Sequence, residues 1–257
     1  MIDLSKPYER VFAFGCSFTK YMYPTWADII ANELPNSEYY NFGTIGSGNL
    51  LISNRIAQAN SKFKFTKSDL VLIMFTTACR EDRYISGKWV SPGNVYIQRG
   101  WYDKNFVKNY CDPGGFLVRD SGIIELVKGY MSALDCETHY LSISGMFSDM
   151  LNEPESIVDK INEIYEECIP KTVPSVLDIV TPELKFWIRP DGSTQPDIHP
   201  DTAQYKQYLE AIGVTLTSVS DDYVNEAMNK LQTAKYNTDF SVLFPDLEDH
   251  VKKYNLI

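Results

Sequence analysis

The chain has 257 residues, of which 44% are hydrophobic, and this is enough to bury a full core as one large α/β domain. Its formal net charge is −10 at pH 7. Because it has no run of Lys or Arg, most of its surface would repel a nucleic-acid backbone or an anionic membrane. The composition therefore favours a small or neutral ligand and argues against nucleic-acid and membrane partners.

The sequence shows no sign of export or of a redox framework. The first six residues lack the basic-then-apolar order of a secretory signal, and no apolar run reaches the ~18 residues of a membrane span. We therefore expect a soluble, cytoplasmic protein. The cysteines are widely spaced, without a C-x-x-C pair, which indicates reduced thiols and neither a disulfide framework nor a zinc site. They are Cys16, Cys79, Cys111, Cys136 and Cys168.

Short apolar runs alternate with helical spacings along the first part of the chain. A run at 11–14 predicts a buried strand, and an early proline with apolar spacing predicts a helix over 27–34. A second strand and helix are predicted at 39–42 and 50–59. A third strand is predicted at 69–75, and its residues are all apolar after Asp69, which is typical of a strand covered on both faces.

An aromatic-rich segment at 84–110 breaks this alternation and is interpreted as an insertion after the third strand. The alternation returns with a helix over 123–134, a strand over 138–143 and a helix beginning near 153. Residues 173–187 fit either a last strand or a segment that wraps the domain. Asp201 can cap a helix that Gly213 ends, and helices from about 214 are additions to a single domain over 1–257.

A glycine, a cysteine and a serine follow the first predicted strand. Gly15 permits a sharp exit from that strand, and ligands bind at the carboxyl ends of strands in open parallel sheets. Successive residues leaving a strand point to opposite sides, so Cys16 and Ser17 should not face one cleft together. One of them is expected to be reactive and the other packed.

Two further segments carry polar or glycine signals. The loop at 43–49 has the spacing G-x-x-G-x-G, which is neither the dinucleotide fingerprint nor a phosphate loop, so we predict no nucleotide cofactor. Asp197 and His199 lie just before the helix that Asp201 caps. A serine is a weak nucleophile that needs a base, and a carboxylate can hold a histidine in the required tautomer. A serine, a glycine loop and an Asp/His pair are the parts that acyl transfer requires.

In these three segments the sequence resembles the SGNH (GDSL) hydrolase family, with matching blocks at 15–19, 41–46 and 197–200. The resemblance implies a three-layer α/β/α sandwich with a flavodoxin-like, mainly parallel sheet. It also implies a serine ester hydrolase that needs no cofactor and no metal. Ser17 would be the nucleophile, His199 the base and Asp197 the residue that orients it. The backbone N–H groups of Ser17 and Gly46 would form part of the oxyanion hole.

The chain departs from the family pattern at three places. Cys16 replaces the aspartate of the G-D-S block. Asp197 lies two residues before the histidine where the family usually has three, which leaves Asp191 as a fallback. The family's G-x-N-D block has no asparagine here, because residues 76–80 read Thr-Thr-Ala-Cys-Arg.

The missing asparagine leaves the third oxyanion donor open. We predict Thr77, or a backbone N–H of its loop, as that donor. Thr76 and Arg80 are predicted to contact substrate, with support of the loop as a second role for Arg80. Trp89 and Trp101 of the insertion could cover the cleft and stack on a sugar, or could only pack.

Other interpretations remain open at this point. Asp197, His199 and Asp201 alternate and could bind a metal if their segment were extended. Cys16 could be a thiol nucleophile. His139 and His250 are expected to be structural.

Two functions follow from the sequence. The first is hydrolysis of an ester, removing an acetyl or other short acyl group from a carbohydrate or small molecule. The second is a catalytically weak or inactive module that holds a carbohydrate or similar ligand in the same cleft.

Overall fold

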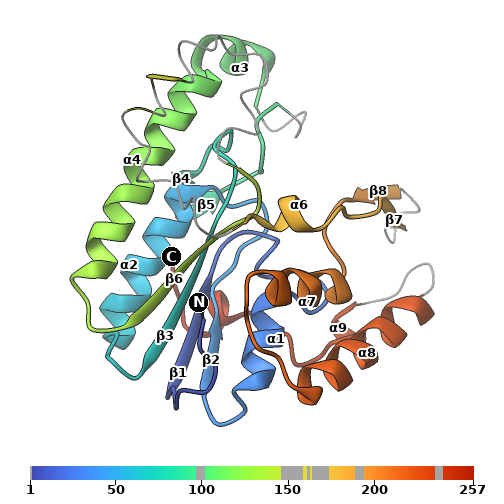
Figure 1. Ribbon diagram of the computed structural model, residues 1–257. Coiled ribbons are helices and arrows are strands. Elements are labelled where there is room, and N and C mark those ends of the chain that lie inside the picture. Colours follow the sequence, from blue (N-terminus) through green and yellow to red (C-terminus); the bar gives the residue numbers. More distant parts are fainter. Residues whose placement is uncertain are drawn as a thin grey trace.

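The computed structural model describes residues 2–96, 102–145, 159–160, 163, 174–188, 194–234 and 240–257. A parallel sheet lies at its centre, with its four strands in the order β2-β1-β3-β6 (Figure 1). These strands are β1 (Arg10–Phe14), β2 (Glu38–Asn41), β3 (Asp69–Phe75) and β6 (Glu137–Ser142).

Helices cover both faces of this sheet (Figure 1). One face carries α1 (Trp26–Glu33) and α7 (Thr202–Ala211), on which α8 (Ser218–Thr233) packs. The other face carries α2 (Asn49–Phe63) and α4 (Pro113–Ser132). The fold is therefore an α/β/α sandwich with a parallel sheet, which confirms the fold class expected from the sequence.

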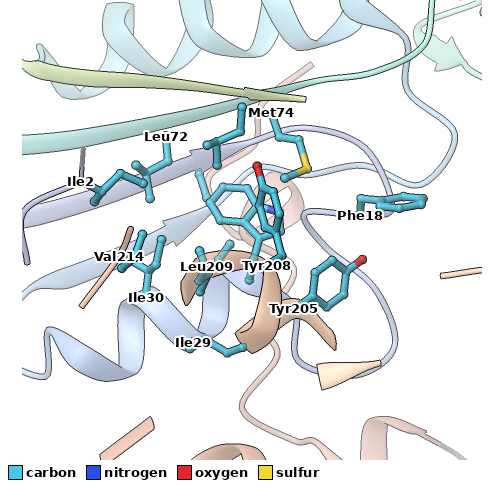
Figure 2. Packing of buried hydrophobic residues seen from close by; sticks show 14 of the residues in the cluster. Ile2, Phe18, Ile29, Ile30, Leu72, Met74, Tyr205, Tyr208, Leu209 and Val214 are labelled. Carbon is cyan, nitrogen blue, oxygen red and sulfur yellow. The ribbon is translucent and has the colours of Figure 1, made fainter. Parts of the chain in front are cut away.

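The alternation of side chains along β3 explains why both faces need a layer of helices. Leu70, Leu72 and Met74 belong to the core on the α1 and α7 side, part of which Figure 2 shows. Val71 and Ile73 belong to the core on the α2 and α4 side. From Leu70 to Phe75 this strand is apolar at every position, so neither face can be left in water and each face must be covered.

The strand order determines where a site can form. The chain runs from β1 to β2 on one side and then returns past β1 to β3, so β1 and β3 are neighbours whose connections leave in opposite directions. In open α/β sheets the crevice at the carboxyl ends of two such strands is the usual ligand site. The loop after β1 contains Ser17.

The insertion and the carboxyl-terminal region add smaller elements. An antiparallel hairpin, β4 (Arg83–Ile85) with β5 (Lys88–Val90), is followed by α3 (Lys104–Tyr110). The region 173–187 contains α6 (Val176–Ile179) and β7 (Lys185–Ile188). Strand β7 pairs with β8 (Thr194–Asp197) in a separate antiparallel hairpin, so the region adds no strand to the main sheet. Helices α9 (Phe240–Leu243) and α10 (His250–Lys253) follow α8.

Two predicted helices differ from the structure or lie outside it. Helix α4 begins at Pro113, ten residues before the predicted start, because Asp112 accepts a hydrogen bond from the N–H of Gly115 at 2.5 Å and caps it. The helix predicted from 153 falls mostly outside the described residues. No helix in the described part of the chain combines the length and the apolar character that a bilayer span needs.

Candidate active site

A tight turn after β1 separates Ser17 from its neighbour Cys16. The N–H groups of Thr19 and Lys20 both donate to the carbonyl of Cys16, at 3.0 and 3.1 Å. A Cβ at Gly15 would overlap the Thr19 side chain, so only glycine fits there. Cys16 is fully buried in the core on the α1 and α7 side, whereas Ser17 contacts the histidine of another segment. The two side chains point in different directions, as predicted from their adjacent positions in the sequence.

Ser17, His199 and Asp197 form a continuous chain of hydrogen bonds. The Ser17 Oγ lies 2.7 Å from Nε2 of His199, and Nδ1 of the same ring lies 2.5 Å from Oδ1 of Asp197. An ionised carboxylate only accepts hydrogen bonds, so Nδ1 carries the proton and Nε2 is left to accept from the serine hydroxyl. This is the tautomer in which a histidine can act as a base toward serine.

The short spacing between Asp197 and His199 is accommodated by a compact turn at the end of β8. Oδ1 of Asp197 accepts both Nδ1–H and the backbone N–H of His199, the latter at 2.9 Å. Asp197 therefore reaches the imidazole without the longer spacing of the family pattern. Asp191, the fallback residue, lies outside the described residues.

Lys185 holds the same turn from the opposite strand. It pairs with Asp197 in the β7–β8 register, and its Nζ donates to the carbonyl of His199 at 3.2 Å. Asp201 lies 4.0 Å from that Nζ and caps α7 by accepting the N–H of Gln204 at 2.9 Å. Within the described ranges, no group of three His, Cys, Asp or Glu residues is arranged to hold a metal ion.

Three aromatic side chains surround the imidazole and its carboxylate. The Tyr21 ring stacks on His199, with the centroids 4.0 Å apart and 22° between the planes, and Phe18 contacts the same ring at 4.9 Å. The Tyr23 hydroxyl donates to Oδ2 of Asp197 at 3.3 Å. Burial, and after it the charge of Asp197, raises the pKa of both Tyr21 and Tyr23. None of these residues was predicted as part of the site, although two tyrosines in the Tyr-Met-Tyr-Pro stretch at 21–24 lie only a few residues after Ser17.

Gly46 lies in a loop that is held against the turn of Ser17. Its φ is +80°, and a Cβ there would come closer than 3.0 Å to the carbonyl of Ser91. Gly15 accepts hydrogen bonds from the N–H of Thr44 and from the hydroxyl of Ser47, both at 3.1 Å. The structure therefore places the glycine loop beside the serine turn.

The two backbone donors that the family resemblance pointed to are not used by any other group in the described part of the chain. Among the described residues, neither the N–H of Ser17 nor that of Gly46 has a hydrogen-bond partner. Arg80 donates from Nη1 to the carbonyl of Ser47 at 3.0 Å, so its contact in the structure is with the loop. Its contact with substrate stays a prediction.

The two threonines after β3 differ in access. Thr76 is 1% exposed, and its hydroxyl has no partner within the described residues. Its backbone is fixed by Asn49, whose side chain accepts the Thr76 N–H at 2.9 Å and donates to the Thr76 carbonyl at 3.0 Å. Thr77 is half-buried and is therefore the more accessible of the two. The third oxyanion donor remains a prediction.

Asn49 is held in turn by a buried carboxylate on α4. Asp120 accepts a hydrogen bond from Asn49 at 2.8 Å and one from Arg119 at 2.7 Å. Burial raises the pKa of Asp120 to about 6, although the guanidinium of Arg119 opposes the shift. This network connects α4 and α2 to the loop that follows β3.

The raised pKa of Asp120 makes a prediction for stability. Between pH ~4 and ~6 the folded protein keeps a proton that the unfolded chain releases, so this group stabilises the fold below that range and loses its contribution as the pH rises through it. The loss is of the order of 3 kcal/mol, at ~1.36 kcal/mol per pKa unit. We expect Asp120→Asn to flatten the pH dependence of the free energy of unfolding over this range, as measured by urea denaturation. Parallel curves for the two proteins would contradict this.

The insertion contacts the glycine loop through the segment after β5. The Ser91 carbonyl lies where a side chain of Gly46 would be, and Ser91 also hydrogen-bonds to Asp82, which accepts the N–H of Gly48 at 2.8 Å. Trp89 is half-buried in the hairpin and packs edge-on against Tyr84. Trp101 lies outside the described residues. Stacking of a substrate on these tryptophans stays a prediction.

The other two histidines lie away from this centre. His139 is on β6 and contacts Glu137 at 3.0 Å, and His250 accepts the N–H of Asn41 through Nδ1 at 2.8 Å. Both contacts suit structural roles.

Comparisons with known proteins give similarity to solved structures only. No protein-family model matches the chain. A search of curated proteins found no significant match. A crystal structure from Bacteroides fragilis, described as a "putative acylhydrolase", is 14% identical, with 85% of this chain and 87% of that chain covered and a TM-score of 0.41. A structure from Veillonella parvula, described as a member of the lipolytic protein G-D-S-L family, is 15% identical over 80% of this chain and 99% of that chain, with a TM-score of 0.39.

Proposed function

We propose that this protein is a serine ester hydrolase of the SGNH (GDSL) type. The observation that supports the proposal is the hydrogen-bonded chain from the Ser17 hydroxyl through His199 to Asp197. The segments that meet there are 182 residues apart in sequence. A serine at the end of a central strand, bonded to a histidine that is itself bonded to a carboxylate, is the arrangement that activates a serine for acyl transfer.

The proposed reaction proceeds through an acyl-enzyme. As Oγ of Ser17 bonds to the ester carbonyl carbon, its proton passes to Nε2 of His199, and Asp197 stabilises the imidazolium. The backbone N–H groups of Ser17 and Gly46 stabilise the oxyanion, with Thr77 or its loop as the further donor. The carbon–oxygen bond to the alcohol then breaks and His199 returns the proton to the leaving alcohol. A water molecule releases the acid by the same steps.

The substrate we propose is an acetyl or other short acyl ester of a carbohydrate or small molecule. The net charge of −10 disfavours polyanionic substrates. Ile45, next to Gly46, and Ile198, next to His199, are 65% and 61% exposed. Exposed apolar residues next in sequence to Gly46 and His199 suit an uncharged acyl group. Trp89, Trp101, Thr76 and Arg80 are proposed to contact the rest of the substrate.

Covalent labelling tests the proposal. A fluorophosphonate or sulfonyl fluoride should add once to the native protein, and peptide mapping should place the adduct on Ser17, because only a serine beside a base attacks such reagents readily. His199→Ala should prevent the adduct, and hydrolysis of an aryl acetate should disappear with it. An unlabelled native protein that still binds sugars would favour the inactive binding module. An adduct on Cys16 would favour the thiol.

A further inference from the structure

We infer that Tyr23 is a positioning residue that fixes the Asp197 carboxylate, and that Tyr21 fixes the imidazole that Asp197 orients. The inference rests on the proposed function, because it assigns a role within the same reaction. Tyr23 acts through its contact with Asp197, and Tyr21 acts through its contact with the imidazole ring of His199. The evidence is the set of hydrogen bonds that the two oxygens of Asp197 accept.

The two oxygens of Asp197 have different partners. Oδ1 takes both hydrogen bonds from His199, from the ring and from the backbone N–H. Oδ2 takes the hydroxyl of Tyr23 at 3.3 Å. Asp197 therefore contacts His199 through Oδ1 alone. Rotation of the carboxylate about its Cβ–Cγ bond would break both of these hydrogen bonds. A donor on the second oxygen opposes the rotation.

Burial makes this donor effective. Asp197 is 2% exposed and Tyr23 is fully buried, so water does not replace a lost hydroxyl at low cost. In such surroundings, polar networks are strengthened and a missing partner is costly. Burial, and after it the charge of Asp197, raises the pKa of Tyr23, so the phenol keeps the proton that it donates.

Tyr21 restrains the ring of His199. Its near-parallel stacking, at 4.0 Å, limits how the imidazole can turn about its own bonds while Nε2 stays on Ser17. Tyr21 and Tyr23 also contact each other edge to face, with the centroids 4.9 Å apart. The two tyrosine rings therefore pack together and restrain His199 and Asp197.

The added carboxyl-terminal helices complete this support. Tyr21 and Tyr23 share a buried cluster with Ala227 of α8 and with Phe244, which follows α9. Tyr23 also lies 6.5 Å from the ring of Phe240 on α9. Helices that the main sheet does not require thus pack on the residues that hold Asp197.

Tyr23→Phe tests the inference with little change in volume. We expect kcat for an aryl acetate to fall about ten-fold, the effect of one hydrogen bond to a charged group, while KM changes less than two-fold. Without the phenol, the carboxylate attracts the imidazolium more strongly. The acid limb of the kcat/KM profile should therefore move to higher pH. The downfield proton resonance of the His199 Nδ1–H should also shift.

Tyr208→Phe is the matched control. Tyr208 is a fully buried tyrosine of α7 whose hydroxyl has no partner among the described residues. We expect it to leave kcat, the pH profile and the resonance unchanged. For Tyr21, replacement by Leu should lower kcat more than replacement by Phe, because Phe keeps the stacked ring and loses only the hydroxyl, which interacts with Asp197.

The readouts separate the failure of the inference from the failure of the proposed function. If the native protein neither hydrolyses esters nor reacts with fluorophosphonate, the function is wrong, and the Nδ1–H resonance still shows whether Tyr23 positions Asp197. If the native protein is active and Tyr23→Phe matches Tyr208→Phe in pH profile and resonance, the inference is wrong. A Tyr23→Phe protein that melts earlier but keeps both signatures shows a purely structural tyrosine, which also overturns it.

Discussion

Ser17→Ala is expected to lower kcat for short-chain aryl esters by about 10⁶-fold and to leave only the residual rate that the oxyanion donors and substrate binding supply. The hydroxyl is the only atom that the change removes from the hydrogen-bonded chain, and without it His199 has no nucleophile to activate. Because Ser17 lies on a turn, outside the helices and strands, the melting temperature should change little. Steady-state kinetics and a thermal melt of the same sample measure both effects.

Cys16→Ala is the matched control for this prediction. The thiol is fully buried in the core, so its removal should reduce stability and leave the turnover close to that of the native protein. Loss of turnover in Cys16→Ala together with retention in Ser17→Ala would instead identify the thiol as the nucleophile.

The parts of the fold that could be predicted from sequence are those with strong local signals. Strand β3 has the predicted bounds because the uninterrupted apolar run over 70–75, which follows Asp69, has few alternatives to a buried strand. The first ten residues of α4 were missed because Gly114 and Gly115 weaken the helical pattern there. The β7–β8 hairpin was missed because an antiparallel pair away from the main sheet leaves no periodicity that distinguishes it from a loop.

The residues of the candidate site also fall into those that a local sequence pattern predicts and those that it does not. Ser17, Gly46 and the Asp197–His199 pair lie in short segments whose composition is itself the signal. The roles of Tyr23 and Lys185 depend on contacts that only the folded chain makes. Tyr23 meets Asp197 across 174 residues of sequence, and no local pattern predicts that pairing. Asn49 was not predicted for the same reason, since its partners lie in the loop after β3 and on α4.

Gly46→Ala is expected to lower kcat by about 100- to 1000-fold, the usual cost of one lost oxyanion donor, with a smaller change in KM. An alanine at this position is unfavourable for two reasons. The φ of +80° is unfavourable for any residue with a Cβ, and that Cβ would overlap the Ser91 carbonyl. The loop must move away from Ser91, and the Gly46 N–H then leaves its place beside the turn of Ser17.

Gly87→Ala separates the two effects, because Gly87 has a φ of +83° and nothing within 4 Å of the position that its Cβ would take. It should lose stability by about 1 to 2 kcal/mol from backbone strain alone and keep its native turnover. Gly46→Ala should lose turnover as well, because only there does the Ser91 carbonyl force the loop to move. Paired urea unfolding curves and kinetics on the two variants measure this difference. If both variants lose similar stability and both keep their activity, the Gly46 N–H is not an oxyanion donor, and the stabilising donors must come from Ser17 and the loop of Thr77.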